Sequence, residues 1–312
     1  MPDEAVTADD EFAAIAADYL DDLSRRHPDT ATELGDHRFD SRLPERSEAS
    51  ASAERAALAG FTGRLDRLDM NALSPELRVD AELVAERLAR RIFELDELRE
   101  DTWNPLAANP GQAIYGLLAR DFAPLPDRLA SVAGRLAQVP EALADARRLL
   151  STVPNAMPKV HLETATTQFD GTIALVRSVP DSAEIGKVRP AALDALAEHR
   201  DWLSARLAGD AEFADPRIGQ ERFARKLSLT LSAEADADAV LTRAEADLDR
   251  VTEEITELAA SLGGTPREVL DRLAADAPDG DTILRFCADA LAAQTAFVAG
   301  HDLVTLYDDP VE

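Results

Sequence analysis

The sequence predicts an all-α protein in which long amphipathic helices form a single domain, residues 1–312. Three observations predict this class. Apolar residues recur with helical spacing along nearly the whole chain, capping residues and prolines mark helix ends, and β-branched runs are scarce. The most strand-like segment is residues 303–307, so we expect at most one short strand, near the C-terminus.

The first helix is expected over residues 9–27. Phe12, Ile15 and Tyr19 fall on one face at i, i+3 and i+7. Pro28 then ends the helix, since proline lacks the amide hydrogen that a continuing helix needs.

The second clear helix begins at Ser74, an N-cap residue type, with Pro75 at the first helical position. It runs to about residue 100. Further helices follow near residues 111–121, 125–151, 158–179, 189–208 and 217–230. We expect Pro140 to break the helix over 125–151.

The last third of the chain repeats the pattern. A helix over 232–262 ends at two glycines, Thr265 and Glu268 form a capping box for the next, and a final helix covers about 281–299. That helix contains Cys287, which we expect to be buried as a small apolar residue.

Charge is the strongest compositional feature. The chain has 60 acidic and 33 basic residues, a formal net charge of −27, which disfavours nucleic acid and anionic membranes as partners. No run of apolar residues reaches membrane-spanning length, the N-terminus resembles no secretory signal, and the single cysteine excludes an internal disulfide. We therefore expect a cytoplasmic protein.

Common catalytic motifs do not occur in the sequence. None of the five histidines lies in a His-Glu-x-x-His pattern, and there is no phosphate-binding glycine loop or Gly-x-Ser-x-Gly elbow. We assign no catalytic residue and no metal ligand in this chain. His161, Gln168 and Thr172 share one helix face, which lines a cleft, is the solvated side of the helix, or forms hydrogen bonds between helices.

Four spaced stretches together resemble the bacterial family known as domain of unknown function 885. They are TELGDHRFDSRLPERS (32–47), LREDTWNPLAANPGQAIYGLLARDFAPLPDRL (98–129), MPKVHLETA (157–165) and ERFARKLSLTLS (221–232). The resemblance implies a mostly helical relative of zincin-type metallopeptidases, whose full-length members bind zinc through a His-Glu-x-x-Gly-His type motif. This sequence matches no position of that motif, so the resemblance implies a truncated or split member that corresponds to the N-terminal helical half.

The resemblance also implies which residues lie near a substrate cleft. The matching segments supply Arg38, Asp40, Trp103, Asn104 and His161, and the polar stripe adds Gln168. Arg38 either meets a substrate carboxylate or pairs with Asp36 or Asp40 in its own loop. Trp103 is more typical of a packing anchor than of a specificity residue.

Three functions remain open from the sequence. The first is a truncated or split zinc-peptidase-like hydrolase that is not catalytic alone and whose partner is a peptide substrate or a missing C-terminal half. The second is a non-enzymatic helical binding protein that uses the same scaffold, and the third is an enzyme with unrelated chemistry. For a truncated chain we expect an exposed apolar surface that supports a homodimer.

Overall fold

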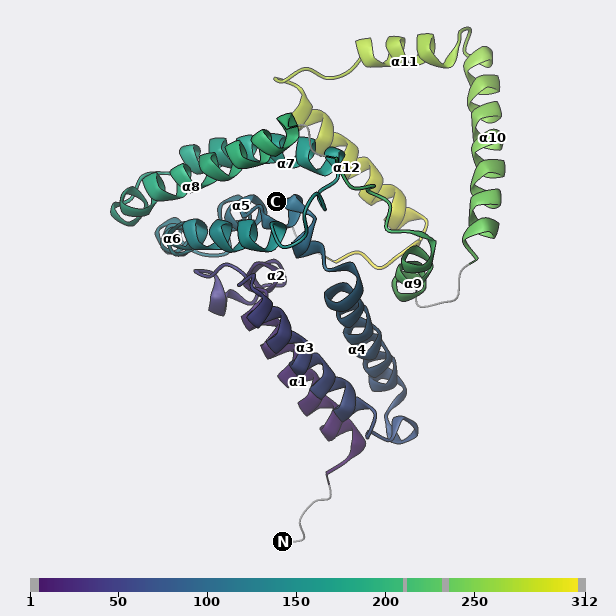
Figure 1. Ribbon diagram of the computed structural model, residues 1–312. Helices are drawn as coiled ribbons and strands as arrows, with labels where there is room; N and C mark the ends of the chain where they lie inside the picture. Colours follow the sequence, from purple (N-terminus) through teal and green to yellow (C-terminus); the bar gives the residue numbers. More distant parts are fainter. Residues whose placement is uncertain (1–5, 210–211, 232–235, 308–312) are drawn as a thin grey trace. The chain divides into compact units, whose positions relative to one another are not determined.

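A computed structural model describes residues 6–209, 212–231 and 236–307. The described residues form helices and connecting turns, with no strand, which confirms the all-α class (Figure 1). Residues 303–307 are among the described residues and form no strand. The described residues divide into two compact units, residues 1–235 (unit 1) and 236–312 (unit 2). The single domain expected from the sequence stays a prediction.

Unit 1 begins with a group of three long helices around one apolar core. They are α1 (Ala8–Arg26), α3 (Glu48–Leu65) and α4 (Pro75–Phe93). Phe12 and Tyr19 of α1 pack with Leu58 and Leu88 in this core. The apolar face predicted for the first helix is therefore buried, and burial of such side chains contributes about 2 kcal/mol each.

Short elements connect these helices. They are α2 (Pro28–Glu33), the 3₁₀ turns η1 (His37–Phe39), η2 (Met70–Ala72), η4 (Glu100–Thr102) and η5 (Pro105–Ala108), and the π-helical turn η3 (Glu94–Leu98). The π turn ends at Arg99, whose φ of 47° lies in the left-handed region.

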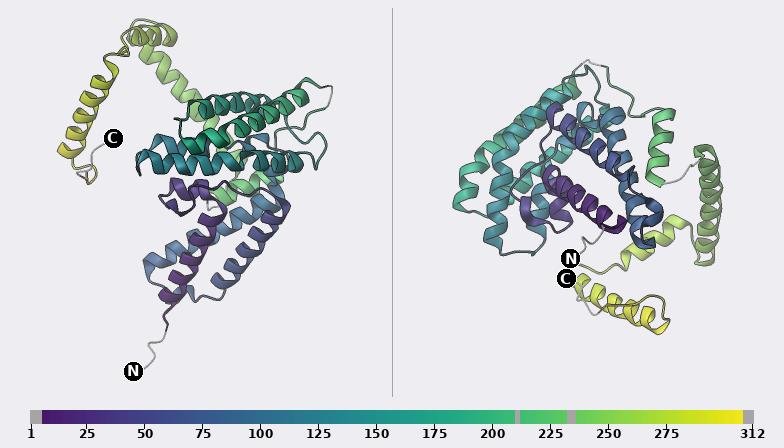
Figure 2. Two further views of the ribbon diagram at one scale, coloured as in Figure 1. Left: turned by 90° about the vertical axis from the view of Figure 1, so that its left-hand side faces the viewer. Right: turned by 90° about the horizontal axis from the view of Figure 1, so that it is seen from below.

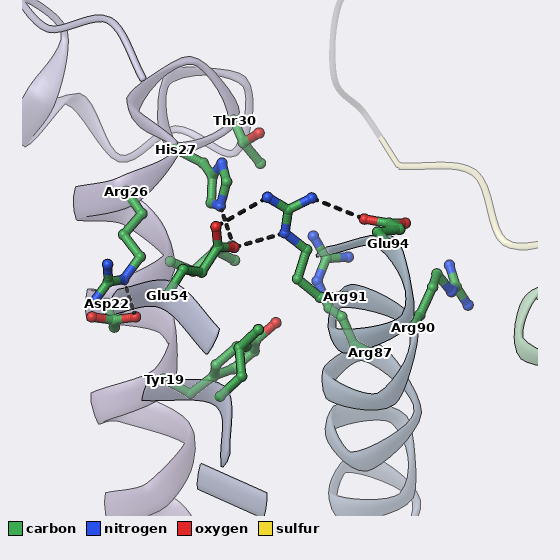
Figure 3. Close-up of a pocket in the computed structure, with 12 residues that line it drawn as sticks. Tyr19, Asp22, Arg26, His27, Thr30, Glu54, Arg87, Arg90, Arg91 and Glu94 are labelled. Carbon is green, nitrogen blue, oxygen red and sulfur yellow. Dashed lines mark hydrogen bonds and ion pairs between the residues drawn. The ribbon is translucent and has the colours of Figure 1, made fainter. Parts of the chain in front are cut away.

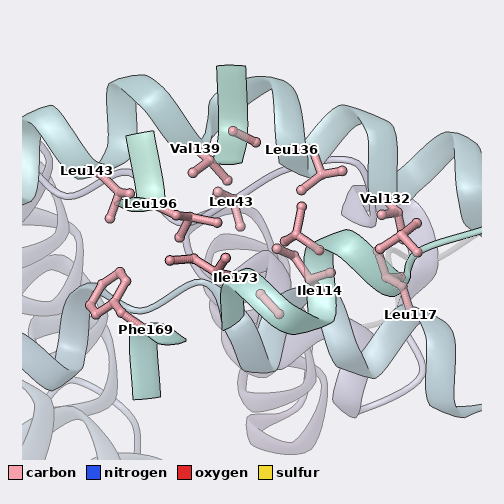
Figure 4. Packing of buried hydrophobic residues seen from close by; sticks show 14 of the residues in the cluster. Leu43, Ile114, Leu117, Val132, Leu136, Val139, Leu143, Phe169, Ile173 and Leu196 are labelled. Atoms are coloured by element: carbon pink, nitrogen blue, oxygen red, sulfur yellow. The ribbon is translucent and has the colours of Figure 1, made fainter. Parts of the chain in front are cut away.

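The second and larger core of unit 1 lies among α5 (Gly111–Ala119), α6 (Leu125–Leu150), α7 (Lys159–Ser178) and α8 (Ala183–Ala208). Figure 4 shows Leu136, Val139 and Leu143 of α6 facing Ile173 and Leu196 across this core. α8 packs along both α6 and α7, as the views in Figure 2 also show.

The break expected at Pro140 is wrong, because α6 continues through it. A proline inside a helix removes one hydrogen bond and crowds the preceding turn. Val139 and Leu143 on either side of it are buried in the larger core, and their packing holds the helix together across the proline. α8 likewise contains Pro190 and begins at Ala183, earlier than the sequence indicates.

Gly134 is required where the chain after η1 crosses α6. A Cβ at this position would lie 2.7 Å from the carbonyl oxygen of Ser41, closer than real Cβ contacts. Gln138 fixes the same crossing, because its side-chain amide donates to the Ser41 oxygen (2.7 Å) and accepts from the Leu43 amide (3.1 Å). The loop that follows η1 is thus held against α6.

The last helix of unit 1, α9 (Gln220–Leu231), packs on α4. Arg225 and Lys226 of α9 form ion pairs with Glu97 and Glu100 just after α4. The Nε of Arg90 donates to the Leu229 carbonyl oxygen at 3.2 Å.

Unit 2 consists of α10 (Ala237–Ser261), α11 (Pro266–Ala275) and α12 (Ile283–Gly300). The predicted capping box of Thr265 and Glu268 is present at the start of α11. Cys287 is exposed, so its expected burial is wrong: the described part of unit 2 buries only Ala259 and Val269. By length and composition alone, α12 is apolar enough to cross a membrane, a criterion that core helices of soluble proteins also meet.

Candidate functional site

Three adjoining hollows in unit 1 meet at His27 and Arg91. Their volumes are about 310, 320 and 290 Å³, and their walls come mainly from α1, α3 and α4 with the turns that follow α4. Together they form a surface that we call the arginine cleft. Figure 3 shows the first hollow, where side chains of α1 and α3 face those of α4.

The local sequence explains why basic side chains gather there. α1 ends with Arg25 and Arg26 in its last turn, and α4 ends with Arg90 and Arg91 in its last turn. Cations at a helix C-terminus are stabilised by the partial negative charge of its unpaired carbonyl groups. Both helices bring these C-terminal turns to the arginine cleft.

An ion-pair chain crosses the middle of the cleft (Figure 3). The Arg91 guanidinium donates to both carboxylate oxygens of Glu54, at 2.7 and 3.0 Å, and to Glu94 at 3.0 Å. The Nε2 of His27 lies 3.0 Å from the same Glu54 oxygen that Nε of Arg91 contacts. Such a two-point contact fixes the plane of the guanidinium.

Glu54 is buried but ionised, because its neighbours His27 and Arg91 stabilise the carboxylate. Burial alone would raise the pKa of Glu54, but hydrogen bonds from His27 and Arg91, together with the Arg91 charge, outweigh it and lower this pKa to about 2. For Arg91, burial acts to lower the pKa, and the bond to Glu54 reverses it, so the net pKa is raised. Both groups are therefore charged at every physiological pH.

The other cations of the first hollow lie around this chain. Arg26 donates to Asp22 at 2.8 Å. Tyr19 is buried, which raises the pKa of its phenol, while the neighbouring Arg87 opposes that rise through its charge and a hydrogen bond. Arg87 itself is exposed and lines the hollow, so its guanidinium is accessible to a ligand.

The cleft differs in charge from the rest of the chain. Nine Lys and Arg residues line the three hollows against seven Asp and Glu. In the whole sequence acidic residues outnumber basic ones by 60 to 33. The lining of the cleft therefore has a small excess of basic residues in an otherwise acidic chain, and low-dielectric walls strengthen the effect of such an excess.

Chemically, the cleft is suited to binding an anion. Arginine presents a planar fork of donors that matches a carboxylate or phosphate in two-point contact. Across the described parts of the chain, no group of three or more His, Cys, Asp or Glu side chains is arranged to hold a metal ion.

Two of the residues expected near a cleft, Arg38 and Asp40, lie at η1. Arg38 is exposed and pairs with Asp36 through two nitrogens (2.9 and 2.7 Å) and with Asp21 at 2.7 Å. Pairing with Asp36 is one of the two alternatives drawn from the sequence. Asp40 is buried, and it accepts from Thr32 at 2.7 Å.

Trp103 and His161 are brought together, with ring centroids 5.5 Å apart. The indole of Trp103 donates to the Leu98 carbonyl oxygen (2.7 Å), which fits a packing anchor. Asn104 caps η5 by accepting from the Leu106 amide at 3.1 Å. None of these contacts reaches Arg38 or Asp40 in the described residues.

Gln168 lies farther along α7 and is exposed. It lines an open hollow of about 580 Å³ together with Thr172 and Asn109. Thr172 donates to Asn109 at 2.7 Å, so part of the polar stripe is hydrogen-bonded to the turn between η5 and α5. The predicted cleft residues thus fall in three separate places.

The residues at the centre of the arginine cleft were not predicted from the sequence. The adjacent basic pairs at 25–26 and 90–91, each just before a helix end, are the signal that points to them. Glu54 gives no such signal, because it is one of 60 acidic residues and only the packing of α3 against α4 shows its partner.

Comparisons with known proteins agree with the helical fold. Residues 28–312 match the family described as "Bacterial protein of unknown function (DUF885)". No curated protein matches the chain. Among solved structures, the chain is similar to one described as "a putative lipoprotein of unknown function from Shewanella oneidensis", with a TM-score of 0.72 and 23% identity. That match covers 95% of this chain and 59% of the other, so the chain spans about three fifths of that structure's length.

Proposed function

Because the chain belongs to the bacterial DUF885 family, we propose that it is a peptide-binding helical part of a zinc-peptidase-like protein. The observation that carries the proposal is the arginine cleft. Its role is to hold a carboxylate of the peptide, either the C-terminal group or an acidic side chain.

The geometry around Arg91 supports a carboxylate ligand. Glu54 holds Arg91 in a two-point contact, so this guanidinium is fixed before a ligand arrives. Arg87, which is exposed, supplies a nearby donor whose pairing with a ligand costs no buried ion pair. A fixed cation beside an accessible one binds an anion with little loss of side-chain entropy.

The catalytic part of the proposal rests on the family resemblance. The His-Glu-x-x-Gly-His type motif does not occur in the 312 residues, and zinc hydrolysis needs such ligands to lower the pKa of a bound water. We therefore propose that this chain does not hydrolyse peptides by itself, and that zinc belongs to longer family members. Its cytoplasmic location stays a prediction.

The alternative is a non-enzymatic binding protein that uses the same scaffold. The observation in its favour is the apolar surface of unit 2, where large side chains such as Leu248, Leu258 and Phe286 are more than half exposed. A helix face of this kind is typical of an interface, either with a second copy or with a further segment of protein. Sedimentation analysis of the purified chain distinguishes an assembly formed through this surface from a monomer.

The binding step is tested by calorimetry with the N-acetylated tripeptide of alanine, as the free acid and as the amide. We expect the free acid to bind and Arg87→Gln to weaken it about tenfold or more, since a charge-assisted hydrogen bond contributes about 1.5–3 kcal/mol. The control is Arg250→Gln, which removes the same charge from exposed α10. Equal losses in both variants would show a general charge effect and overturn the site.

The catalytic step is tested separately. The purified chain is incubated with a library of peptides after chelation and again with one equivalent of zinc. The proposal expects no cleavage under either condition. Cleavage that requires added zinc and survives repurification would refute the non-catalytic assignment, while leaving the binding result unaffected.

A further inference from the structure

A fourth hollow of about 300 Å³ lies in unit 1 and shares no lining residue with the arginine cleft. Its walls come from α2, the segment around η1, α5 and α6. Exposed Glu33, Tyr115 and Arg120 line it, and so does the buried Arg135. The hollow therefore extends from the surface to a buried cation, and we call it the Arg135 cavity.

Arg135 is 1% exposed and has incomplete partners. Its terminal nitrogens donate to the carbonyl oxygens of Ala113 and Pro28 and, at 2.7 Å, to the Thr32 hydroxyl. Its Nε is buried and donates to no acceptor in the described parts of the chain. All its partners are neutral, although a buried guanidinium is normally paired with an anion.

Asp40, an acidic residue whose charge acts on Arg135, is already hydrogen-bonded to other groups. Asp40 accepts from Thr32 with one oxygen (2.7 Å) and lies 3.0 Å from the Nδ1 of His37 with the other. It influences Arg135 only through space: burial lowers the pKa of Arg135, and the charges of Asp40 and Asp29 oppose that change without a direct contact. Among the described residues, the Arg135 guanidinium therefore lacks an acceptor for its Nε hydrogen and has no anion in direct contact.

The carboxylate of Asp29, whose charge is opposite to that of Arg135, also lines the cavity. Its Oδ1 is buried and accepts no hydrogen bond from the described residues. A buried carboxylate oxygen without a donor is costly, just as a buried guanidinium nitrogen without an acceptor is. Within the part of the chain that the structure describes, Arg135 and Asp29, which both line the cavity, thus each have one unpaired polar atom, a donor on the cation and an acceptor on the anion.

Two stacked rings form a flat part of the remaining wall, beside polar side chains such as Gln112. The rings of His37 and Phe122 stack with centroids 3.9 Å apart and an interplanar angle of 4°, and both line the cavity. Tyr115 and Gly116 of α5 line it as well, and Gly116 leaves open space, since a Cβ added there would meet no atom within 4 Å. Such walls accept an apolar or aromatic group.

We propose that the Arg135 cavity binds a free α-amino acid with an apolar or aromatic side chain. Its carboxylate accepts from Arg135, its ammonium group donates to Asp29, and its side chain lies against the His37–Phe122 stack. One zwitterion satisfies both unpaired groups at once, which an anion or a cation alone does not. This inference is independent of the proposed function.

The test uses calorimetry with L-phenylalanine, 3-phenylpropionate, which lacks the ammonium group, and phenethylamine, which lacks the carboxylate. We expect L-phenylalanine to bind and each analogue to bind about tenfold more weakly or worse, because each lacks one charge-assisted contact. If either analogue binds as tightly as the amino acid, the zwitterion assignment is wrong. If none of the three binds at millimolar concentration, the two atoms hold ordered water only and the proposal fails.

A cavity-filling variant locates the binding without disturbing Arg135. Gly116→Leu places a side chain in the cavity and improves helix propensity, so the fold should be kept. The matched control is Gly60→Leu on α3, where an added Cβ also meets no atom within 4 Å. We expect Gly116→Leu to lose binding at least tenfold and Gly60→Leu to bind like the wild type; undiminished binding by Gly116→Leu would place the ligand elsewhere and overturn the proposal.

Discussion

One buried histidine, His199, should contribute strongly to the pH dependence of unit 1 stability. Its side chain is 0% exposed in the larger core, between the rings of Phe169 and Trp202, at centroid distances of 4.8 and 5.4 Å. Burial, with a smaller contribution from the charge of Arg147, lowers the pKa of His199 from 6.5 to about 4. The folded state therefore keeps this ring neutral where the unfolded chain protonates it.

The sign follows from this difference. Above pH 6.5 the ring is neutral in both the folded and the unfolded state, so the ionisation of His199 does not lower the free energy of unfolding. As the pH falls from 6.5 to about 4 the unfolded state gains a proton that the folded state does not, so stability decreases, and below pH 4 the loss is complete. Lowering this pKa from 6.5 to about 4 corresponds to a loss of about 3 kcal/mol of unfolding free energy in all, of which about 2 kcal/mol is lost between pH 7 and pH 5.

The assay is urea unfolding followed by tryptophan fluorescence, because both tryptophans, Trp103 and Trp202, lie in unit 1. Between pH 7 and pH 5 the free energy of unfolding should fall by about 2 kcal/mol more in the wild type than in His199→Leu, which has no titrating ring. His301→Leu in unit 2 serves as the control and should behave like the wild type. The same pH slope in His199→Leu as in the wild type would refute the reasoning.

Three further predictions concern packing, charge and exposure. Gly134→Ala should destabilise unit 1 by about 1–3 kcal/mol in urea unfolding, because the new methyl group meets the Ser41 carbonyl oxygen; an unchanged midpoint would show that this crossing is loose. Glu54→Gln should cost about 2–3 kcal/mol at pH 7, since it leaves Arg91 without its main counter-charge. Because the pKa of Glu54 is lowered from 4.5 to about 2, its contribution is present above pH 4.5 and lost as the pH falls towards 2, so wild type and Glu54→Gln should converge in acid. Cys287 is exposed and should react with a thiol reagent at the same rate in native buffer and in denaturant; protection in native buffer would mean that another surface covers α12.

Much of the fold was predictable from local chemistry. The apolar spacing of Phe12, Ile15 and Tyr19 predicts the buried face of α1, and the Thr265–Glu268 capping box predicts the start of α11. These signals are local, because hydrogen bonds and side-chain positions within one or two turns determine them.

The failures have a common cause in tertiary structure. Pro140 breaks an isolated helix, but in α6 the buried neighbours Val139 and Leu143 compensate for the lost hydrogen bond. Cys287 has the sequence context of a buried residue, and its exposure reflects what packs against α12, which no local pattern records.

The arginine cleft was missed for a related reason. Its central contact joins Glu54 to Arg91, 37 residues apart in the chain, and only the packing of α3 against α4 brings them together. Arg38, by contrast, was expected near a cleft because of the family resemblance, and in the structure it pairs with its neighbour Asp36. Composition alone cannot identify the acidic partner of either Arg91 or Arg38, because the chain has 60 acidic residues.

The claim that the arginine cleft binds a peptide carboxylate is tested most directly by the side-chain Nε signals of ¹⁵N-labelled arginine. These are assigned by single Arg→Lys variants and followed while the acetylated tripeptide is added. We predict that the signals of Arg87 and Arg91 shift with the free acid and stay in place with the amide. Shifts confined to arginines outside the cleft, or equal shifts with acid and amide, would contradict the account.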